Sequence, residues 1–390
     1  MKKIEKRVVG VTCLGHAMTH VYILAFATAL PVLITDFNVT LTEITRIGTL
    51  SYLLYGLGAF PSGILAARTN AKFTLQLFFL FSGIASVLIG FTHSLSVFTG
   101  AIVLLGLVGS LYHVSGLTLI SHVIQKRGKA LGIHGVAGSA GIALTPVLTG
   151  FIISQLGWRE VYFILAIPGF AGFLFLLFDK TIPHAHVQVR ESDQTKKRAL
   201  PLQVIVIAGL VMCINGLIYR GFMTMLPTYI GENVTLGGFS AVLTGGLFST
   251  IILSVGMIGQ FTGGHLSDRL PMIRLYLIVV ALTLPFMFLI SMTQNALLVL
   301  SALLFALFHF PQQPVENHLV AHIIPPKFVS WAYGIKFTLT FGVGSFAAGL
   351  AGLVADTWSL STVFVFLGGM IVLSALLIAI LVRREKEILQ

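Results

Sequence analysis

Long apolar runs, separated by short polar connections, follow one another along almost the whole chain of 390 residues. A helix needs about 20 mostly apolar residues to cross the hydrocarbon core of a bilayer, and the runs reach roughly that length. They cover residues 10–34, 43–66, 73–91, 95–124, 130–154, 160–178, 202–230, 238–264, 273–292, 296–324, 328–354 and 360–382. The pattern therefore predicts an all-α membrane protein with twelve transmembrane helices.

One connection is much longer than the others and divides the predicted helices into two sets of six. It covers residues 179–200, is polar and charged, and carries the basic cluster Lys196-Lys197-Arg198. We therefore expect an N-terminal six-helix bundle over residues 1–178, a cytoplasmic linker over residues 179–200, and a C-terminal six-helix bundle over residues 201–390.

The two halves repeat short sequence patterns in the same order. Gly132-Ile133-His134 in the first half recurs as Gly334-Ile335-Lys336 in the second half. Three further pairs are Leu30-Pro31 with Leu226-Pro227, Gly63-Ile64-Leu65-Ala66-Ala67-Arg68 with Gly264-His265-Leu266-Ser267-Asp268-Arg269, and Ser121-His122 with Ala321-His322. A duplicated six-helix unit is typical of secondary transporters, whose substrate site lies between the halves near the middle of the membrane.

Composition and charge support a membrane protein and exclude a nucleic-acid-binding one. Hydrophobic residues make up 56% of the chain and charged residues 9%, whereas soluble domains carry about 25% charged residues. The net charge is +11, but all except four of the 24 lysines and arginines lie at the termini or in alternate connections. This distribution follows the positive-inside rule, so we expect a multi-pass protein of the plasma (inner) membrane with both termini in the cytoplasm.

The predicted tenth helix, residues 296–324, carries a group of polar side chains. His309, Gln312, Gln313 and Glu316 recur at spacings that place all four on one helical face. A carboxylate or imidazole that faced lipid would cost about 3 kcal/mol near the helix centre, so this face has to border the bundle interior or a watery cavity. The group is therefore a candidate functional site, and a buried structural hydrogen-bond network is the alternative.

The other ionisable side chains within the predicted helices are mostly cationic or can become so. Arg220 lies in the seventh helix and Lys336 in the eleventh, whereas Glu316 is the one obvious acid. Buried positive charge is unfavourable unless an anion neutralises it, so we expect a small anionic substrate such as a carboxylate or phosphonate. Arg220 would anchor it, because a guanidinium offers a planar pair of donors; capping of backbone carbonyls by Arg220 is the alternative. Further donors to the substrate are expected from His16, His20, His113, His309, Gln312 and Gln313.

Glu316 is the natural carrier of a coupling proton. Glu316 and Lys336 fall at similar depths in neighbouring predicted helices, so we expect them to pair. Protonation of Glu316 would release Lys336, and two states of the pair could favour opposite openings of the transporter. His134, at the repeat position equivalent to Lys336, joins them as a proton-coupling candidate. A purely structural salt bridge, or a proton carried by a cavity histidine, is the alternative.

The motif Gly264-His265-Leu266-Ser267-Asp268-Arg269 has the form Gly-x-x-x-Asp-Arg, and its first-half equivalent ends in Ala67-Arg68. With this motif and the duplicated halves, the whole chain resembles the major facilitator superfamily of transporters. The resemblance implies that helices 1, 4, 7 and 10 line a central cavity. It also implies gating roles for Asp268, Arg269 and Arg68. Within the superfamily, Gly109-Ser110-Leu111-Tyr112-His113 is similar to the fosmidomycin-resistance group, which implies export of an anionic compound.

Two other classes of function use the same residues. A transition-metal or metal-chelate (siderophore-like) transporter would take its ligands from His16, His20, His113, His309 and Glu316. The two intramembrane cations repel a bare metal ion but not an anionic chelate. A non-transporting sensor or a membrane enzyme has less support, because no Ser–His nucleophile pair and no His-Glu-x-x-His helix occurs. We therefore expect a monomer without enzymatic activity, cofactor or resident metal, whose partners are a small anion, protons and the lipid bilayer.

Overall fold

The computed structural model of the chain describes residues 1–124, 127–184, 202–323 and 335–385. The regular elements of these residues are helices, and none is a strand. Among them, eleven helices are long and apolar enough to cross a membrane, and one bent pair of shorter helices supplies a twelfth span. The prediction of an all-α protein with twelve transmembrane helices is confirmed. Helices suit this environment because each satisfies its own backbone hydrogen bonds where no water is present.

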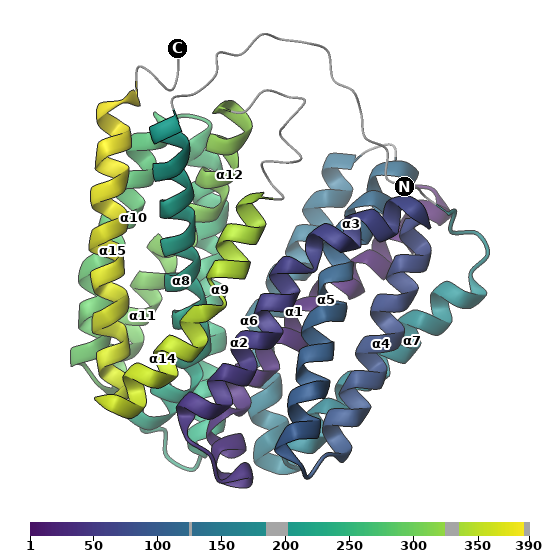
Figure 1. The fold of residues 1–390 in the computed structure, drawn as a ribbon, viewed down its shortest axis with the longest axis horizontal. Coiled ribbons are helices and arrows are strands. Elements are labelled where there is room, and N and C mark those ends of the chain that lie inside the picture. Colours follow the sequence, from purple (N-terminus) through teal and green to yellow (C-terminus); the bar gives the residue numbers. More distant parts are fainter. Residues whose placement is uncertain (125–126, 185–201, 324–334, 386–390) are drawn as a thin grey trace.

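The helices form two groups, which Figure 1 shows side by side. The first group, called the N-half, contains α1 (Lys3–Phe37), α2 (Leu41–Leu57), α3 (Ala59–Arg68), α4 (Ala71–Phe91), α5 (Leu95–Val123), α6 (Arg127–Gln155) and α7 (Trp158–Phe178). The second group, called the C-half, contains α8 (Leu202–Asn233), α9 (Ala241–Ser267), α10 (Met272–Met292), α11 (Asn295–His309), α12 (Gln312–Ile323), the π-helix η2 (Thr338–Val343), α14 (Phe346–Thr357) and α15 (Leu360–Arg383). Each half has a largely separate apolar core. Most of the expected linker lies outside the described residues.

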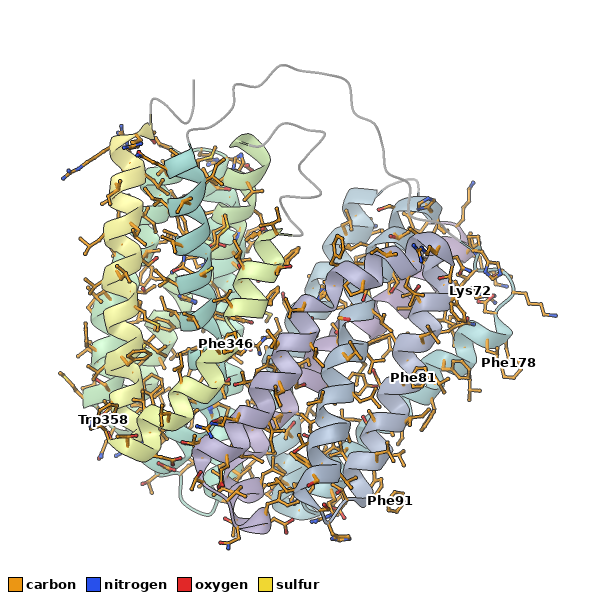
Figure 2. All side chains as sticks on the ribbon, in the orientation of Figure 1. Lys72, Phe81, Phe91, Phe178, Phe346 and Trp358 are labelled. Carbon is orange, nitrogen blue, oxygen red and sulfur yellow. The ribbon has the colours of Figure 1, made fainter. Side chains whose placement is uncertain are left out.

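Large apolar side chains project outward from both halves. Phe91, Phe178 and Trp358, labelled in Figure 2, are 70%, 74% and 70% exposed. A soluble monomer rarely exposes a large continuous apolar surface, because water makes such exposure unfavourable. The outward-facing apolar side chains therefore form the surface that contacts lipid.

Local polar signals reverse the chain between α1 and α2. Asn38 ends α1 with a left-handed backbone, φ 51°, which asparagine tolerates better than most residues. Thr40 then caps α2: its hydroxyl accepts a hydrogen bond from Glu43 N (3.1 Å), and its own backbone N donates to the Glu43 carboxylate (2.8 Å). This reciprocal capping box satisfies two backbone donors that the first turn of a helix leaves free.

The two halves contact each other through α2 with α14 and through α6 with α9. Thr42 N of α2 donates to Asp356 Oδ2 of α14 at 2.7 Å, and the Thr42 hydroxyl donates to the same oxygen at 2.6 Å. Seven residues, about two turns, further along each of these helices, Gly349 N donates to Thr49 Oγ1 at 2.9 Å. These bonds lie toward the end of the molecule opposite to the two chain termini (Figure 1).

Glycines allow this close approach between the halves. A Cβ atom at Gly56 would lie 2.7 Å from Gly342 N, and a Cβ atom at Gly150 would lie 2.8 Å from Val242 O. Toward the end that carries both termini, called the terminal end, the helices of the two halves diverge (Figure 1). The hydrogen bonds between α2 and α14 therefore join the two halves at the end opposite to the terminal end.

Candidate functional site

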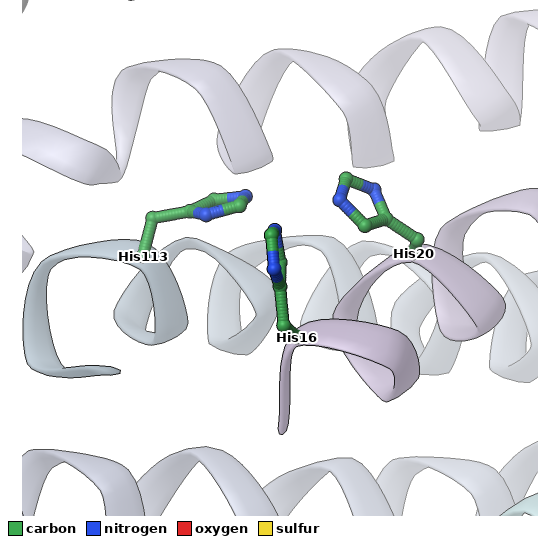
Figure 3. A group of neighbouring side chains, drawn as sticks. All are labelled: His16, His20 and His113. Atoms are coloured by element: carbon green, nitrogen blue, oxygen red, sulfur yellow. The ribbon is translucent and has the colours of Figure 1, made fainter. Parts of the chain in front are cut away.

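Three histidines converge inside the N-half (Figure 3). His16 and His20 lie one turn apart on α1, so they share a helical face, and His113 approaches them from α5. One ring nitrogen from each lies within 4.8 Å of the others, and all three side chains are half-buried. The Tyr55 hydroxyl of α2 lies 2.7 Å from His113 Nε2 and orients that ring. We call His16, His20 and His113 the histidine cluster.

His134 of α6 lies directly behind the histidine cluster. Its ring stacks on His16 with 4.1 Å between the ring centroids, and its carbonyl oxygen lies 2.7 Å from His16 Nδ1. The Tyr112 hydroxyl lies 2.7 Å from His134 Nε2. Gly138 makes the arrangement possible, because a Cβ atom at that position would overlap the His16 ring. The structure therefore places His134 with the N-half histidines and not with the Glu316–Lys336 pair.

Arg220 of α8 reaches across to the N-half. Its guanidinium carbon lies 4.0 Å above the centroid of the Tyr52 ring of α2, and the residue is only 4% exposed. Its charge also acts on His20. None of the salt bridges formed by the described residues involves Arg220. Contact with an aromatic face stabilises a buried cation by about 2 kcal/mol, but it does not neutralise the charge of the guanidinium.

The C-half holds an ion pair instead of a group of imidazoles. Lys336 Nζ lies 3.2 Å from Glu316 Oε2, and the two side chains are 3% and 5% exposed. The Tyr276 hydroxyl and Asn215 Nδ2 both donate to Glu316 Oε1, the second at 3.1 Å. Ser374 Oγ donates in turn to Asn215 Oδ1 at 2.8 Å. The pairing expected from the sequence is confirmed, and the additional hydrogen bonds satisfy a carboxylate that burial would otherwise destabilise. We call these five residues the carboxylate network.

The polar residues of the predicted tenth helix do not share one face throughout. His309 and Gln312 are each 4% exposed, and Gln312 Nε2 lies 3.1 Å from His309 Nδ1. Gln313 is exposed, and Gln260 of α9 donates to its side-chain oxygen at 2.9 Å. The prediction of a common face is therefore wrong for Gln313. The reason is a break in the helix, since α11 ends at His309 and α12 begins at Gln312.

Gln312 also carries an unsatisfied acceptor. Its side-chain oxygen is buried and has no hydrogen-bond partner within the described part of the chain. A buried acceptor without a partner costs about 1–3 kcal/mol, so it favours a ligand that supplies a donor. The substrate-binding role of Gln312 stays a prediction, and its buried, unpartnered oxygen is a structural reason for it.

The three gating candidates lie exposed at the terminal end. Arg68 closes α3, while Asp268 and Arg269 follow α9. The one ionic contact recorded for them among the described residues joins Asp268 Oδ1 to His318 Nδ1 at 3.9 Å. The expected latch is thus open in this conformation, in which the halves diverge at that end. Its gating role stays a prediction.

Two basic residues near these candidates instead brace each half internally. Lys72 Nζ, at the start of α4, donates to the carbonyl oxygen of Asp179 at 2.8 Å. Arg274, near the start of α10, pairs with Glu385 at 2.8 Å. Each basic residue thus ties the third span of its half to the end of the sixth. The two halves share this brace, as expected for repeats of one unit.

Several residues of the site escaped the sequence analysis. Each is an uncharged polar residue within an apolar run, so its sequence position did not distinguish it from packed helix residues. Their signal was only the occurrence of a polar group among apolar neighbours, which is also common in packed helices. The residues are Tyr52, Tyr55, Tyr112, Asn215, Tyr276 and Ser374.

Twelve spans in two pseudo-repeated halves, with a polar site between and within them, define a membrane transporter fold. The sequence matches the Major Facilitator Superfamily profile over residues 12–345. The chain belongs to this superfamily.

Sequence relatives of the chain include transporters and sensors. A probable sulfoacetate transporter, SauU, from Cupriavidus necator is 24% identical over 69% of this chain and 66% of its own length. A probable hexose phosphate transport protein from Chlamydia trachomatis is 27% identical over 43% of this chain and 37% of its own length. The membrane sensor protein UhpC from Escherichia coli is 26% identical over 37% of this chain and 34% of its own length. The matches thus span less than two thirds of each of these relatives.

Solved structures share the fold at low sequence identity. A bacterial homologue of the human lysosomal transporter Spinster, in an inward-facing and occupied conformation, superposes with a TM-score of 0.81 at 16% identity and covers 98% of both chains. A D-xylose–proton symporter superposes with a TM-score of 0.79 at 16% identity, covering 95% of this chain and 96% of its own. At such identities the similarity establishes the architecture alone.

Proposed function

We propose that this protein is a secondary active transporter that moves a small organic anion by alternating access in exchange or together with protons. The observation that carries this proposal is the Arg220 guanidinium, which is 4% exposed, lies between the halves and forms no salt bridge with the described residues. A buried cation requires a counter-charge, and a carboxylate, sulfonate or phosphate matches the guanidinium geometrically. The solute thus completes the site.

The names of the relatives support an anionic solute. Sulfoacetate, hexose phosphate and L-galactonate are all anions at neutral pH, although the relatives that carry these names share only 21–27% identity with this chain. The histidine cluster would supply neutral or cationic N–H donors to the solute from the N-half, while Arg220 and Gln312 would bind it from the C-half. His309 orients Gln312 through their hydrogen bond.

Alternating access follows from the arrangement of the halves. We infer from the positive-inside distribution that the terminal end lies in the cytoplasm of a plasma (inner) membrane. The structure then represents an inward-facing state, in which contacts such as Thr42 with Asp356 close the outer side. Rocking of one half against the other would break these contacts and bring the Arg68 and Asp268 ends together. We propose that the transporter works as a monomer, because one chain contains both halves.

We assign proton coupling to the carboxylate network. Protonation of Glu316 would remove the charge that holds Lys336, and the freed ammonium would favour a different packing of the two helices. The groups facing Glu316 are Lys336, Tyr276 and Asn215. A π-helical segment, η2, begins two residues after Lys336, and such irregular turns often mark positions where helices change shape. His134 has no contact with this network, so we do not assign the coupling proton to it.

Ligand-induced thermal stabilisation of the purified protein tests the anion site. The panel contains carboxylates, sulfonates, sugar phosphates, phosphonates, inorganic anions, divalent metals and ferric chelates, with wild type and Arg220→Ala compared. We expect an organic anion to stabilise the wild type. The same anion should bind Arg220→Ala roughly 10- to 100-fold more weakly, because the variant lacks a charge-assisted hydrogen bond to the anion.

The control variant is Arg159→Ala. Arg159 pairs with Asp36 at 2.9 Å and lies beside Trp158, far from the histidine cluster, so its removal should leave anion affinity unchanged. Equal stabilisation of wild type and Arg220→Ala by every anion would contradict the proposal. Stabilisation by ferric chelates alone would favour the metal-chelate transporter instead.

The UhpC relatives make a non-transporting sensor the second candidate. Uptake or counterflow of the stabilising anion in proteoliposomes separates the two functions, because a sensor binds the anion without moving it. The similarity of Gly109-Ser110-Leu111-Tyr112-His113 to the fosmidomycin-resistance group predicts export. The direction of the pH gradient that drives transport in proteoliposomes checks that prediction.

A further inference from the structure

We propose that the histidine cluster, His16, His20 and His113, is a binding site for a divalent transition-metal ion of the Zn²⁺ type. Among the described residues, this is the group of three or more potential ligands close enough to hold one ion. The ion is neither the solute of the proposed transport reaction nor needed for it. The site lies wholly within the N-half, so it is present whichever way the halves rock.

The distances suit three imidazoles on one ion. One nitrogen from each ring already lies within 4.8 Å of the others (Figure 3). Tetrahedral Zn²⁺ with bonds of about 2.0–2.1 Å places its nitrogen ligands about 3.4 Å apart. Side-chain rotations that move each nitrogen by roughly 1 Å close the difference, and the three rings are only half-buried. His16 and His20 also have the i, i+4 spacing by which one helix offers two histidines to a single ion.

The hydrogen bonds around the cluster prepare two of the rings for a metal. His16 Nδ1 lies 2.7 Å from the His134 carbonyl oxygen, so Nδ1 carries the proton and Nε2 keeps its lone pair. His113 Nε2 lies 2.7 Å from the Tyr55 hydroxyl, and in the tautomer whose Nε2–H donates to that oxygen, Nδ1 keeps its lone pair as the ligand atom. Metal-binding histidines usually have such a partner on the second ring nitrogen, because it fixes the tautomer and the orientation of the ring.

The charge around the cluster determines the fourth ligand. The charge of Arg220 acts on His20, so a bare dication would be repelled from this position. Three imidazoles leave one tetrahedral position open, and a chloride, hydroxide or carboxylate there would neutralise part of the charge and contact Arg220. The site therefore takes the ion together with an anion. An ion in this place fills space that we assign to the transported solute, so Zn²⁺ should inhibit transport; this consequence alone rests on the proposed function.

Calorimetric titration of the tag-free, detergent-purified protein with Zn²⁺ tests the site. We expect about one ion per chain in the wild type, and at least a tenfold loss of affinity in His20→Ala and in His113→Ala. Co²⁺ should give the intense visible absorption of a tetrahedral ion in the wild type and lose it in both variants. His122→Ala, which removes an exposed imidazole elsewhere on α5, is the matched control and should bind Zn²⁺ as the wild type does.

Two milder variants keep all three imidazoles. They test the site even if His20→Ala or His113→Ala fails to fold. Tyr55→Phe removes the partner of His113, and Gly138→Ala displaces the His16 ring. Each should weaken Zn²⁺ binding about tenfold or more. Absence of saturable binding to the wild type, or equal binding by wild type, His20→Ala and His113→Ala, would overturn the metal site. Neither result bears on anion binding, which Arg220→Ala tests separately.

Discussion

The two halves place polar groups at equivalent repeat positions but use opposite chemistry there. In the N-half, His134 lies in a group of imidazoles and phenols, with Tyr112 at 2.7 Å. In the C-half, the equivalent residue is Lys336, which forms a buried ion pair with Glu316 at 3.2 Å. Both halves still share the brace between their third and sixth spans. The scaffold of the repeat has thus been kept while its interior chemistry has diverged.

This difference separates binding from coupling in physical terms. Uncharged imidazoles and phenols can exchange hydrogen-bond partners at modest cost, so the N-half group suits contact with a solute or an ion. A buried ion pair tolerates no loss of either partner, because the remaining charge is left in a medium of low polarity. Protonation of Glu316 removes its negative charge and with it the attraction to Lys336, so the C-half network suits coupling.

The largest expected effect contrasts the two equivalent positions directly. Lys336→Met leaves the Glu316 carboxylate buried without its cation and should lower the free energy of unfolding by about 3–5 kcal/mol. His134→Leu removes an uncharged hydrogen bond with Tyr112 and the ring stacking on His16, and it should cost about 1–3 kcal/mol. Denaturant unfolding in detergent micelles measures both. Equal losses of unfolding free energy in the two variants would contradict the proposed difference between the two halves.

A second prediction concerns coupling. Glu316→Gln/Lys336→Met removes both charges, so it should recover most of the stability that Lys336→Met loses. In proteoliposomes the double variant should still exchange the solute across the membrane, but uptake driven by a pH gradient should fall to the background level. Retained gradient-driven uptake would show that Glu316 does not carry the proton.

A third prediction concerns the contact between the halves. Gly352→Val places side-chain atoms of α14 against the start of α2, where a Cβ atom would already lie 2.9 Å from Leu41 O. Overpacking of this kind costs about 1–3 kcal/mol, so the population should shift roughly 5- to 150-fold toward the state in which this contact opens. Spin labels at the exposed positions 68 and 268 should then report a shorter distance as the terminal end closes.

Gly63→Val is the matched control for that experiment. Gly63 lies in α3, outside this contact, and a Cβ atom there meets nothing within 4 Å. The control should therefore keep the label distance of the wild type. A shift of the same size in both variants would mean that loss of a flexible glycine, and not overlap at the contact, moves the halves.

The smallest expected effect lies at the terminal end of the N-half. Burial of the Asp179 carboxyl raises its pKa, but hydrogen bonds from Thr181 and the charge of Arg7 outweigh burial, so the pKa lies below its usual value. The stability that this carboxylate contributes is present above its unfolded-state pKa of about 3.9 and is lost as the pH falls through the lower folded-state pKa.

Asp179→Asn should therefore lower stability at pH 7 by at most about 1 kcal/mol. The difference between wild type and variant should disappear only below about pH 4. Thermal unfolding at a series of pH values measures it. A difference that vanished between pH 6 and pH 8 would point to another group.

Some of the site was predictable because charge inside a membrane is rare and costly. Arg220, Glu316 and Lys336 each interrupt an apolar run, so their burial and the pairing of the last two followed from position and sign. The prediction that Gln313 shares a face with His309, Gln312 and Glu316 was wrong because it required one continuous helix. The structure breaks that helix between His309 and Gln312 and turns Gln313 toward Gln260.

By itself, the sequence determined the all-α fold and the number of spans, because these depend on local hydrophobicity and on residues close together in the chain. Only the tertiary structure decided that His113 joins His16 and His20, that Arg220 lies on Tyr52, and that Tyr276 and Asn215 hold Glu316. These groups come from helices far apart in the sequence. Their meeting depends on how glycines and side chains let those helices pack, which no single stretch of sequence encodes.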